Sequence, residues 1–419
     1  MIAMFTDRLF GKHSPRLGGL DILKFIGPGF LVTVGFIDPG NWATNIAAGS
    51  YHGYALLWVV TLSTLMLIIL QHNAAHLGIV TGLCLAESST KFFGRMTSRL
   101  FLSSALAAAV STALAEILGA AIGLNMLLHI PIRTGALMTA LAAGYLLFSN
   151  NYKKLERWII AIVSVIGFSF LFELSLVNVG WKEAAGGWVM PSIPKRSLPL
   201  VMSILGAVVM PHNLFLHSEI IQSRQMNIRG DAAIEKQLKY EFTDTLFAML
   251  IGWGINSAII IMAASVFFDR GILVTDLMQA DATLKPLLGG AAGIIFGLAL
   301  LLSGFSSSVT AAMAGGSIFS GMFGEPFDIS DSHSRTGAAI TLTGAVAAAF
   351  LLNDFFQGII WSQIILSIQL PWSIFFLVRL TSSSRAMGKF SNSLADNLLL
   401  WSTAIIVSGL NVVLFASMI

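Results

Sequence analysis

The sequence predicts an all-α membrane protein that crosses the bilayer many times. Of its 419 residues, 56% are hydrophobic and 11% are charged, and the mean hydropathy is +0.81. A soluble globular chain carries about 25% charged residues. The apolar residues gather in runs of about 20, the length that an α-helix needs to cross a bilayer, whereas a membrane β-barrel has short alternating segments. A polytopic helical bundle is therefore the expected fold class.

Apolar runs bounded by polar or Pro/Gly-rich turns predict eleven transmembrane helices. They cover residues 22–49, 54–82, 98–128, 133–150, 156–178, 198–222, 240–268, 289–322, 335–352, 356–379 and 396–417. Residues 1–21 form a cytoplasmic N-terminal segment, and 22–379 form a ten-helix core. The core divides into two repeats of five, 22–178 and 198–379, and a peripheral eleventh helix follows.

The first run is interrupted by the polar sequence Asp38-Pro-Gly-Asn41. An ionisable side chain at bilayer depth is costly unless it faces a cavity, a partner or an ion. Pro39 removes a backbone donor and Gly40 tolerates nearly any backbone angle, so the helix can open beside the carboxylate. Opened backbone at this depth must be buried in protein or line a cavity. We expect the Asp38 carboxylate, the Asn41 carboxamide and freed carbonyl groups to converge, which suits a cation.

The sixth run carries a second interruption, at Pro211 within Gly206-Ala-Val-Val-Met-Pro-His-Asn-Leu-Phe-Leu-His217. Broken helices in corresponding positions of two halves indicate a transporter binding site, because inverted repeats bring half-helix ends together at the membrane midplane. The alternative is two kinked helices with a hydrogen-bonded aspartate, since prolines are common in transmembrane helices. The pair of prolines together with Asp38 favours the binding site. The repeat itself is inferred from position alone.

The residues at the two breaks favour a transition-metal ion. Asp38 and Asn41 are three apart and can share one side of the helix, and their oxygens suit Mn²⁺, Fe²⁺, Mg²⁺ or Ca²⁺. A thioether such as that of Met210 bonds to late first-row metals and offers little to Mg²⁺ or Ca²⁺. The Ala207 carbonyl, freed by Pro211, is the expected fourth ligand. An isolated methionine would instead be assigned to packing.

Other ionisable side chains also lie inside the predicted spans. His212 is a candidate for a proton path, because histidine titrates near neutral pH. His217 is about 140° away on the helix, so the two do not share an ion, and its alternative role is a structural hydrogen bond. Glu116 needs a partner or a protonated carboxyl group. His72 and His76 offer either a two-histidine metal face or, the favoured interpretation, a hydrogen-bonded helix surface.

The charge distribution predicts the topology. With the N-terminus in the cytoplasm, 18 of the 24 lysines and arginines lie inside, as the positive-inside rule requires, and an odd number of spans leaves the C-terminus outside. The basic residues are scattered, so the net charge of +3 indicates no nucleic-acid partner. The single cysteine, Cys84, excludes an internal disulfide and a cysteine metal cage. No cleavable signal is evident in the polar, basic residues 1–19. The His-Glu-x-x-His motif of a metalloprotease is also missing, so we expect no enzyme.

The two interruptions resemble the signature motifs of the Nramp divalent metal transporters: Asp38-Pro-Gly-Asn41 and Met210-Pro-His212. Further matches are Gly78-Ile-Val-Thr-Gly82, Ala115-Glu-Ile-Leu-Gly119, Asn213-Leu-Phe-Leu-His-Ser218 and Ser362-Gln-Ile-Ile-Leu-Ser-Ile-Gln-Leu-Pro371. The resemblance implies the LeuT-type inverted-repeat fold with helices 1 and 6 broken. It also implies alternating access in the plasma (inner) membrane, with import of Mn²⁺ or Fe²⁺, usually with protons. The metal is then the transported substrate, and no cofactor is expected.

Carried over by position, the resemblance makes Asp38, Asn41, Met210 and the Ala207 carbonyl the metal ligands. It adds Gln363 of the tenth span as a direct or water-mediated ligand. His212 and Glu116 match the family's proton-route positions.

Two positions depart from the family pattern. The aspartate that usually lies three residues before Glu116 is Ala113 here, and the arginine pair that usually opens the ninth span aligns with Gly337 and Ala338. Only Arg335 lies close by. Losing an acid and its basic partners removes the outward end of a proton route. We therefore expect weakened or absent proton coupling with metal binding retained.

Two other functions fit the same fold. One is a Mg²⁺ carrier without proton coupling, but a thioether at 210 can hardly replace the tightly held water around Mg²⁺. The other is a sodium-coupled amino-acid symporter, which needs an open half-helix N-terminus for a substrate carboxylate. Asp38 would repel that carboxylate. The expected function is secondary transport of divalent transition-metal ions.

Overall fold

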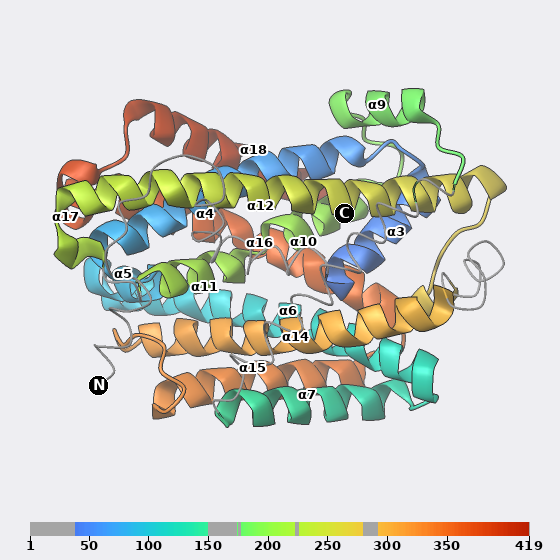
Figure 1. Cartoon of the computed structure of the whole chain (residues 1–419), viewed down its shortest axis with the longest axis horizontal. Coiled ribbons are helices and arrows are strands. Elements are labelled where there is room, and N and C mark those ends of the chain that lie inside the picture. The colour runs from blue at the N-terminus through green and yellow to red at the C-terminus, as the bar shows by residue number, and fades with distance from the viewer. Residues whose placement is uncertain (1–37, 150–173, 175–176, 223–225, 280–291, 419) are drawn as a thin grey trace.

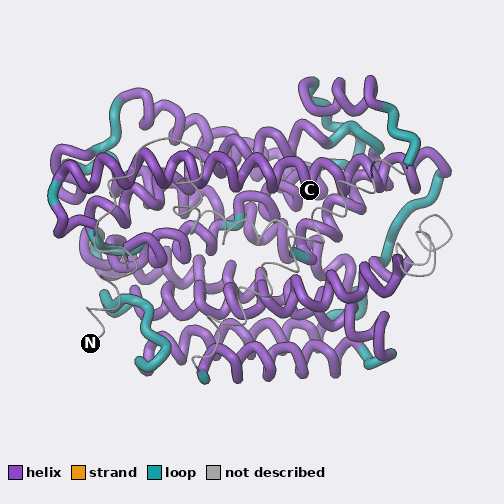
Figure 2. The backbone as a smooth tube through the Cα atoms, in the orientation of Figure 1, coloured by secondary structure: helices purple, strands orange, loops and turns teal. Residues whose placement is uncertain are grey.

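The computed structural model describes residues 38–149, 174, 177–222, 226–279 and 292–418. Within these ranges the chain forms helices joined by short connections, and no residue of them is in a strand (Figures 1 and 2). The N-terminal segment, the first part of the first predicted span and nearly all of the fifth lie outside the described residues.

Eight described helical segments are long and apolar enough to cross a membrane. The uninterrupted helices are α4 (Leu57–Thr81), α6 (Arg95–Leu128), α12 (Asp231–Val266), α14 (Ala292–Gly321), α15 (Ser332–Leu351), α16 (Phe355–Thr381) and α18 (Leu394–Met418). The shorter α7 (Ile132–Phe148) is also apolar. These bounds lie within a few residues of the predicted ones, except at the start of α12.

Helix α12 begins nine residues before the apolar run that predicted it. Gly230 has a φ of 88°, a conformation that glycine adopts easily, and Asp231 lies in the first turn of the helix. An acidic residue there is favourable because of the helix dipole, and Ala, Glu, Lys, Gln and Leu in 232–239 are good helix formers. Hydropathy marks where a helix enters the membrane, so it missed this exposed beginning.

Two helices are interrupted. The described part of the first span is α3 (Pro39–His52), and the sixth span is divided into α10 (Leu198–Val209) and α11 (Pro211–Gln222). In Figure 1 these segments and α16 lie in the middle of the bundle, between the α7 and α15 edge and the edge formed by α4, α12 and α18. Both breaks therefore lie inside the protein.

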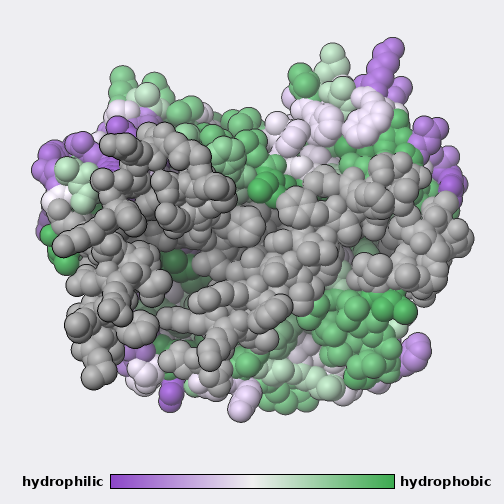
Figure 3. Space-filling view, in the orientation of Figure 1, coloured by the Kyte–Doolittle hydropathy of each residue, from purple (hydrophilic) through white to green (hydrophobic). Residues whose placement is uncertain are grey.

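The burial of the spans distinguishes the centre of the bundle from its outside. In α10 and α11, 89% of the most apolar window is buried, against 33% in α18, which packs on α16, α10 and α4. Figure 3 shows hydrophilic residues toward the left and right ends and hydrophobic surface between them on the described flanks. The long helices run in that same direction, as expected for a multi-pass membrane protein.

Shorter elements occupy the connections. They are α5 (Leu85–Phe92), α9 (Trp181–Val189), α17 (Ser384–Met387) and the 3₁₀ turns η3 (Met226–Arg229), η4 (Phe268–Arg270) and η5 (Gly388–Phe390). Cys84 and Glu87 form a capping box at the start of α5, so the single cysteine has a structural role there. On α9, Trp188 donates a hydrogen bond to Ser257 of α12 at 3.1 Å.

Candidate metal-binding site

The break in the first span is organised by Asp38, which caps the N-terminus of α3. Its Oδ1 accepts hydrogen bonds from the Asn41 backbone nitrogen at 2.6 Å and from Asn41 Nδ2 at 2.9 Å. Pro39 occupies the first turn, where its missing N–H costs no helical hydrogen bond. Asp38 is only 3% exposed. A buried carboxylate is thus held at the positive end of a half-helix.

The break in the sixth span is a left-handed residue. Met210 has φ 45° and ψ 80°, a conformation that is uncommon outside glycine. Its backbone N–H donates to the Gly206 carbonyl at 3.0 Å and closes α10. Pro211 then begins α11, and since it has no N–H it cannot donate to the Ala207 carbonyl one turn earlier. The Met210 sulfur accepts a hydrogen bond from Asn213 Nδ2 at 3.2 Å.

The two breaks are joined directly by Asn41. Its Nδ2, already bonded to Asp38, also donates to the Ala207 carbonyl at 3.1 Å. One turn further along α3, Thr44 hydrogen-bonds Ser203 of α10 at 2.7 Å. Asp38, Asn41 and the Ala207 carbonyl therefore lie together, and two half-helices far apart in sequence are held side by side.

Gln363 of α16 closes another side of this cluster. A Cβ added at Gly40 would collide with the Gln363 side-chain amide and lie 3.3 Å from Asp38 Oδ1. A Cβ at Gly206 would collide with the Gln363 carbonyl, so α10 and α16 approach closely. The Gln363 amide nitrogen donates to Ser362 Oγ at 3.1 Å. Glycines at 40 and 206 thus give this glutamine its place beside Asp38.

Glu116 lies near the cluster on α6. It is 2% exposed, and its Oε2 has no hydrogen-bond partner in the described part of the protein. Gly119, one turn further along α6, lies so close to Pro39 that a Cβ there would collide with the proline ring. Helix α6 therefore brings a second carboxyl group toward the break.

The two histidines of α11 face different helices. His212 Nδ1 lies 3.1 Å from Thr112 Oγ1 of α6. His217 lies between Gln71 of α4, at 3.2 Å, and Glu241 of α12, at 3.4 Å. None of these three contacts is shared by the two rings.

Sequence reasoning missed the acid that His217 contacts. Glu241 is 4% exposed and also bonds His72 Nδ1 at 2.5 Å and Thr245 at 2.6 Å. His76 stacks on His72 with ring centroids 6.5 Å apart. Glu241 lies at the polar end of the apolar run 240–268. A carboxylate at that position is normally interpreted as a surface residue at the end of a membrane span. The sequence did place His217 and Glu241 on separate predicted spans. An ionisable residue on each of two spans was the signal that could have suggested a contact between them.

The family model described as natural resistance-associated macrophage protein-like, Nramp, matches residues 29–417. The chain belongs to the Nramp family. A divalent metal cation transporter MntH of Caldanaerobacter subterraneus is 37% identical to it over 93% of this chain and 92% of the relative. Another MntH, from Nostoc sp., is 39% identical over 93% of this chain and 90% of the relative.

Solved structures agree with the Nramp assignment. A manganese transporter of Eremococcus coleocola, crystallised with an aromatic bis-isothiourea compound, superposes with a TM-score of 0.79 at 29% identity. That match covers 97% of this chain and 89% of the other. The nucleobase-cation-symport transporter Mhp1 shares the fold alone, with a TM-score of 0.63 at 15% identity over 91% and 90% of the two chains. The predicted LeuT-type membrane fold is confirmed, and the count of eleven helices stays a prediction.

The three positions predicted to depart from the Nramp pattern are packed tightly in this protein. Ala113 and Ala338 are fully buried. A Cβ at Gly337 would lie 2.5 Å from the Gly315 carbonyl and from Phe319 Cβ, so α15 and α14 leave no room for a side chain there. Arg335 is exposed and donates to the Ile329 carbonyl at 2.8 Å.

Proposed function

We propose that this Nramp chain is a secondary transporter that imports divalent transition-metal ions, Mn²⁺ and Fe²⁺, by alternating access. The observation that carries the proposal is the meeting of the two helix breaks through Asp38, Asn41 and the Ala207 carbonyl. Opened backbone and a buried carboxylate at the same point form a cation site of the kind found in transporters of this architecture. The names of the relatives, divalent metal cation transporter and manganese transporter, support the same substrate class.

The proposed ligands are Asp38, Asn41, the Ala207 carbonyl, Met210 and Gln363. Two oxygen acceptors, Asp38 Oδ1 and the Ala207 carbonyl, face one Asn41 nitrogen. A cation in the position of that nitrogen meets the same two oxygens. Asn41 then has to turn its amide so that the oxygen faces the metal, and Gln363 is near enough to Asp38 to add an oxygen directly or through water.

Met210 supplies the selectivity in this proposal. Burial at 3% exposure gives its thioether little competition from water, and sulfur favours late first-row metals over Mg²⁺ and Ca²⁺. The left-handed backbone at 210 is unfavourable for a residue with a Cβ. Metal binding by the thioether would explain why methionine is present there instead of glycine. The alternative hypothesis of a Mg²⁺ carrier does not explain a methionine at this position, because a thioether is a poor ligand for Mg²⁺.

Proton coupling is proposed to be weak or absent. The resemblance implies that Nramp proteins usually have an aspartate and an arginine pair where this chain has Ala113, Gly337 and Ala338. The tight packing of Gly337 against α14 supports the absence of charged groups from this interface. Glu116, His212 and His217 remain the proposed route for any proton that does move, with Thr112 beside His212 and Glu241 beside His217.

We propose the plasma (inner) membrane as the location, with the N-terminus in the cytoplasm and the C-terminus outside. The positive-inside distribution of lysine and arginine supports this orientation. The division into repeats at 22–178 and 198–379 and a peripheral helix at 396–417 belongs to the same proposal. Burial of only a third of the apolar window of α18 supports that last assignment.

A side-by-side measurement of Mn²⁺ and Mg²⁺ binding tests the proposal. Isothermal titration of the purified chain should give Mn²⁺ binding that Met210→Ala weakens at least about tenfold, by analogy with the loss of a residue that supports a metal site. Met210→Leu keeps the volume and lacks the sulfur, so it should lose Mn²⁺ affinity equally. Mg²⁺ binding should change little in both variants. Equal losses for the two metals would support the Mg²⁺ carrier instead.

A further inference from the structure

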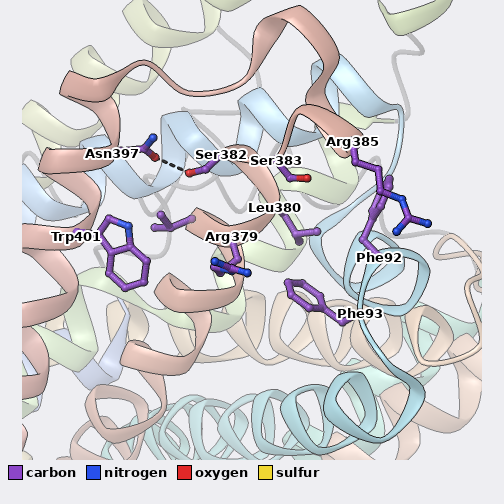
Figure 4. Close-up of a pocket in the computed structure, with 10 residues that line it drawn as sticks. Phe92, Phe93, Arg379, Leu380, Ser382, Ser383, Arg385, Asn397 and Trp401 are labelled. Atoms are coloured by element: carbon purple, nitrogen blue, oxygen red, sulfur yellow. Dashed lines mark hydrogen bonds between the residues drawn. The ribbon is translucent and has the colours of Figure 1, made fainter.

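A pocket of about 530 Å³ lies where α16 ends (Figure 4), at the end of the bundle where Figure 1 labels α17. Its walls come from α16, α17, the start of α18 and the end of α5. Its lining includes two basic, two hydroxyl and two aromatic side chains: Arg379, Arg385, Ser382, Ser383, Phe93 and Trp401. Both guanidinium groups belong to exposed residues, and within the described ranges neither is in an ion pair. The pocket thus gathers two positive charges without an acidic partner.

The polar walls of the pocket are fixed by hydrogen bonds. Ser382 Oγ donates to Asn397 Oδ1, which ties the end of α16 to the first turns of α18. The backbone nitrogens of Ser382 and Ser383 donate to Val378 and Leu380, and so extend α16 by a turn. In Figure 4 Arg379 lies between Trp401 and Phe93 in the view, and Arg385 lies beside Phe92. The arginines therefore stand on a rigid frame.

An aromatic pair borders the pocket on the side of the membrane. Phe375 lies one turn before Arg379 on α16, and its ring meets that of Trp401 edge to face at 6.0 Å. The two residues are 41% and 38% exposed. Leu398 and Ile405 of α18 are 64% and 69% exposed, which fits a helix that faces lipid. Tryptophan and basic residues in this order, beyond exposed apolar residues, mark the boundary between hydrocarbon and headgroups.

A second cavity of about 460 Å³ adjoins the first across Phe93, which lines both. It contains Arg95 and Arg99 at the start of α6. Neither is in an ion pair within the described chain. These four arginines, which form no ion pair with any other described residue, give this end of the bundle a positive charge that attracts phosphate.

We propose that the pocket at the end of α16 binds the phosphate headgroup of an anionic glycerophospholipid. Arginine matches phosphate geometry with two parallel hydrogen bonds, and the Ser383 hydroxyl adds a donor. The acyl chains then lie along Phe375, Trp401 and the exposed face of α18. Basic pockets between transmembrane helices on the positively charged side are a recognised form of lipid site. The apolar border distinguishes a lipid from a free phosphate ion, which would make no use of it.

Native mass spectrometry of the delipidated full-length chain, titrated with phosphatidylglycerol or phosphatidylcholine, tests this inference. The wild type should prefer phosphatidylglycerol. The double variant Arg379→Gln with Arg385→Gln should weaken phosphatidylglycerol binding about thirtyfold, from about 1 kcal/mol for each basic residue. The preference should also fall as salt is raised. The matched control is Arg196→Gln with Arg270→Gln, which removes two exposed arginines elsewhere and should leave binding unchanged.

Two further variants distinguish a loss of lipid binding from a folding defect. Arg379→Lys with Arg385→Lys keeps the charge and loses the planar fork, so it should bind with intermediate affinity. Trp401→Leu should weaken the lipid without changing the response to inorganic phosphate. Equal binding by the wild type and a folded double glutamine variant would overturn the inference. Inorganic phosphate that competes as well as lipid at equal concentration would also overturn it, because the ligand would then be a soluble anion.

Discussion

The side-chain nitrogen of Asn41 lies 3.1 Å from the carbonyl oxygen of Ala207, 166 residues further along the chain. The same nitrogen lies 2.9 Å from Asp38 Oδ1. An N–H group thus satisfies two oxygens that a divalent cation would also bind. In the proposed site an ion would replace that donor and the Asn41 amide would turn, so one side chain would respond to the substrate at both breaks.

Replacing Asn41 separates its two roles. Asn41→Ala removes both the ligand oxygen and the bridge to Ala207, and we expect Mn²⁺ affinity to fall at least about tenfold. Asn41→Asp removes the bridging N–H and keeps an oxygen, so Mn²⁺ affinity should be retained. Isothermal titration of both variants measures this. Equal losses in the two would assign Asn41 a purely structural role.

The contact between Gly119 and Pro39 predicts a steric phenotype. Gly119→Ala has to displace the proline that opens α3, and overpacking of this kind costs about 1–3 kcal/mol. Thermal stability and Mn²⁺ uptake should both decrease. Gly254→Ala in α12 is the matched control, because nothing lies within 4 Å of the added Cβ. A stable, active Gly119→Ala protein would contradict the close approach of α6 to the break.

Proton movement can be followed with a pH-sensitive dye inside liposomes. We expect Mn²⁺ uptake by this chain with little internal acidification, compared with an Nramp transporter that has the aspartate and the arginine pair. Ala113→Asp alone should not restore coupling, because the partner positions at Gly337 and Ala338 are filled by tight packing. Acidification equal to that of the reference transporter would refute the proposed loss of coupling.

Glu87 predicts a pH dependence of stability. Burial, with the Glu219 carboxylate nearby, raises the pKa of Glu87 above its ordinary value of 4.5. The folded state then disfavours the charged form, so stability is full below the ordinary value and falls as pH rises from there through the raised pKa. Glu87→Gln removes this loss and can still accept the Cys84 N–H bond.

The Tm of Glu87→Gln should therefore exceed that of the wild type at about pH 8 and approach it at about pH 4. Asp396→Asn, an exposed acid at the start of α18, serves as a comparison for a general charge effect. A constant difference in Tm across this range would contradict the assignment to Glu87.

The sequence predicted the positions of the two helix breaks, which obey local rules. A proline after an aspartate inside an apolar run placed the break at Asp38, and Pro211 placed the freed carbonyl at Ala207. Long-range partners were harder to predict. The bond between His217 and Glu241 joins separate helices, and its geometry depends on how α11 and α12 pack. The early start of α12 was missed for another reason, since hydropathy does not register helix propensity.

The positive φ at Met210 has a further implication for how this protein can vary. Glycine or asparagine would suit that backbone better, but neither carries the thioether of the proposed metal site. Backbone preference and the proposed choice of metal are therefore opposed at this one residue.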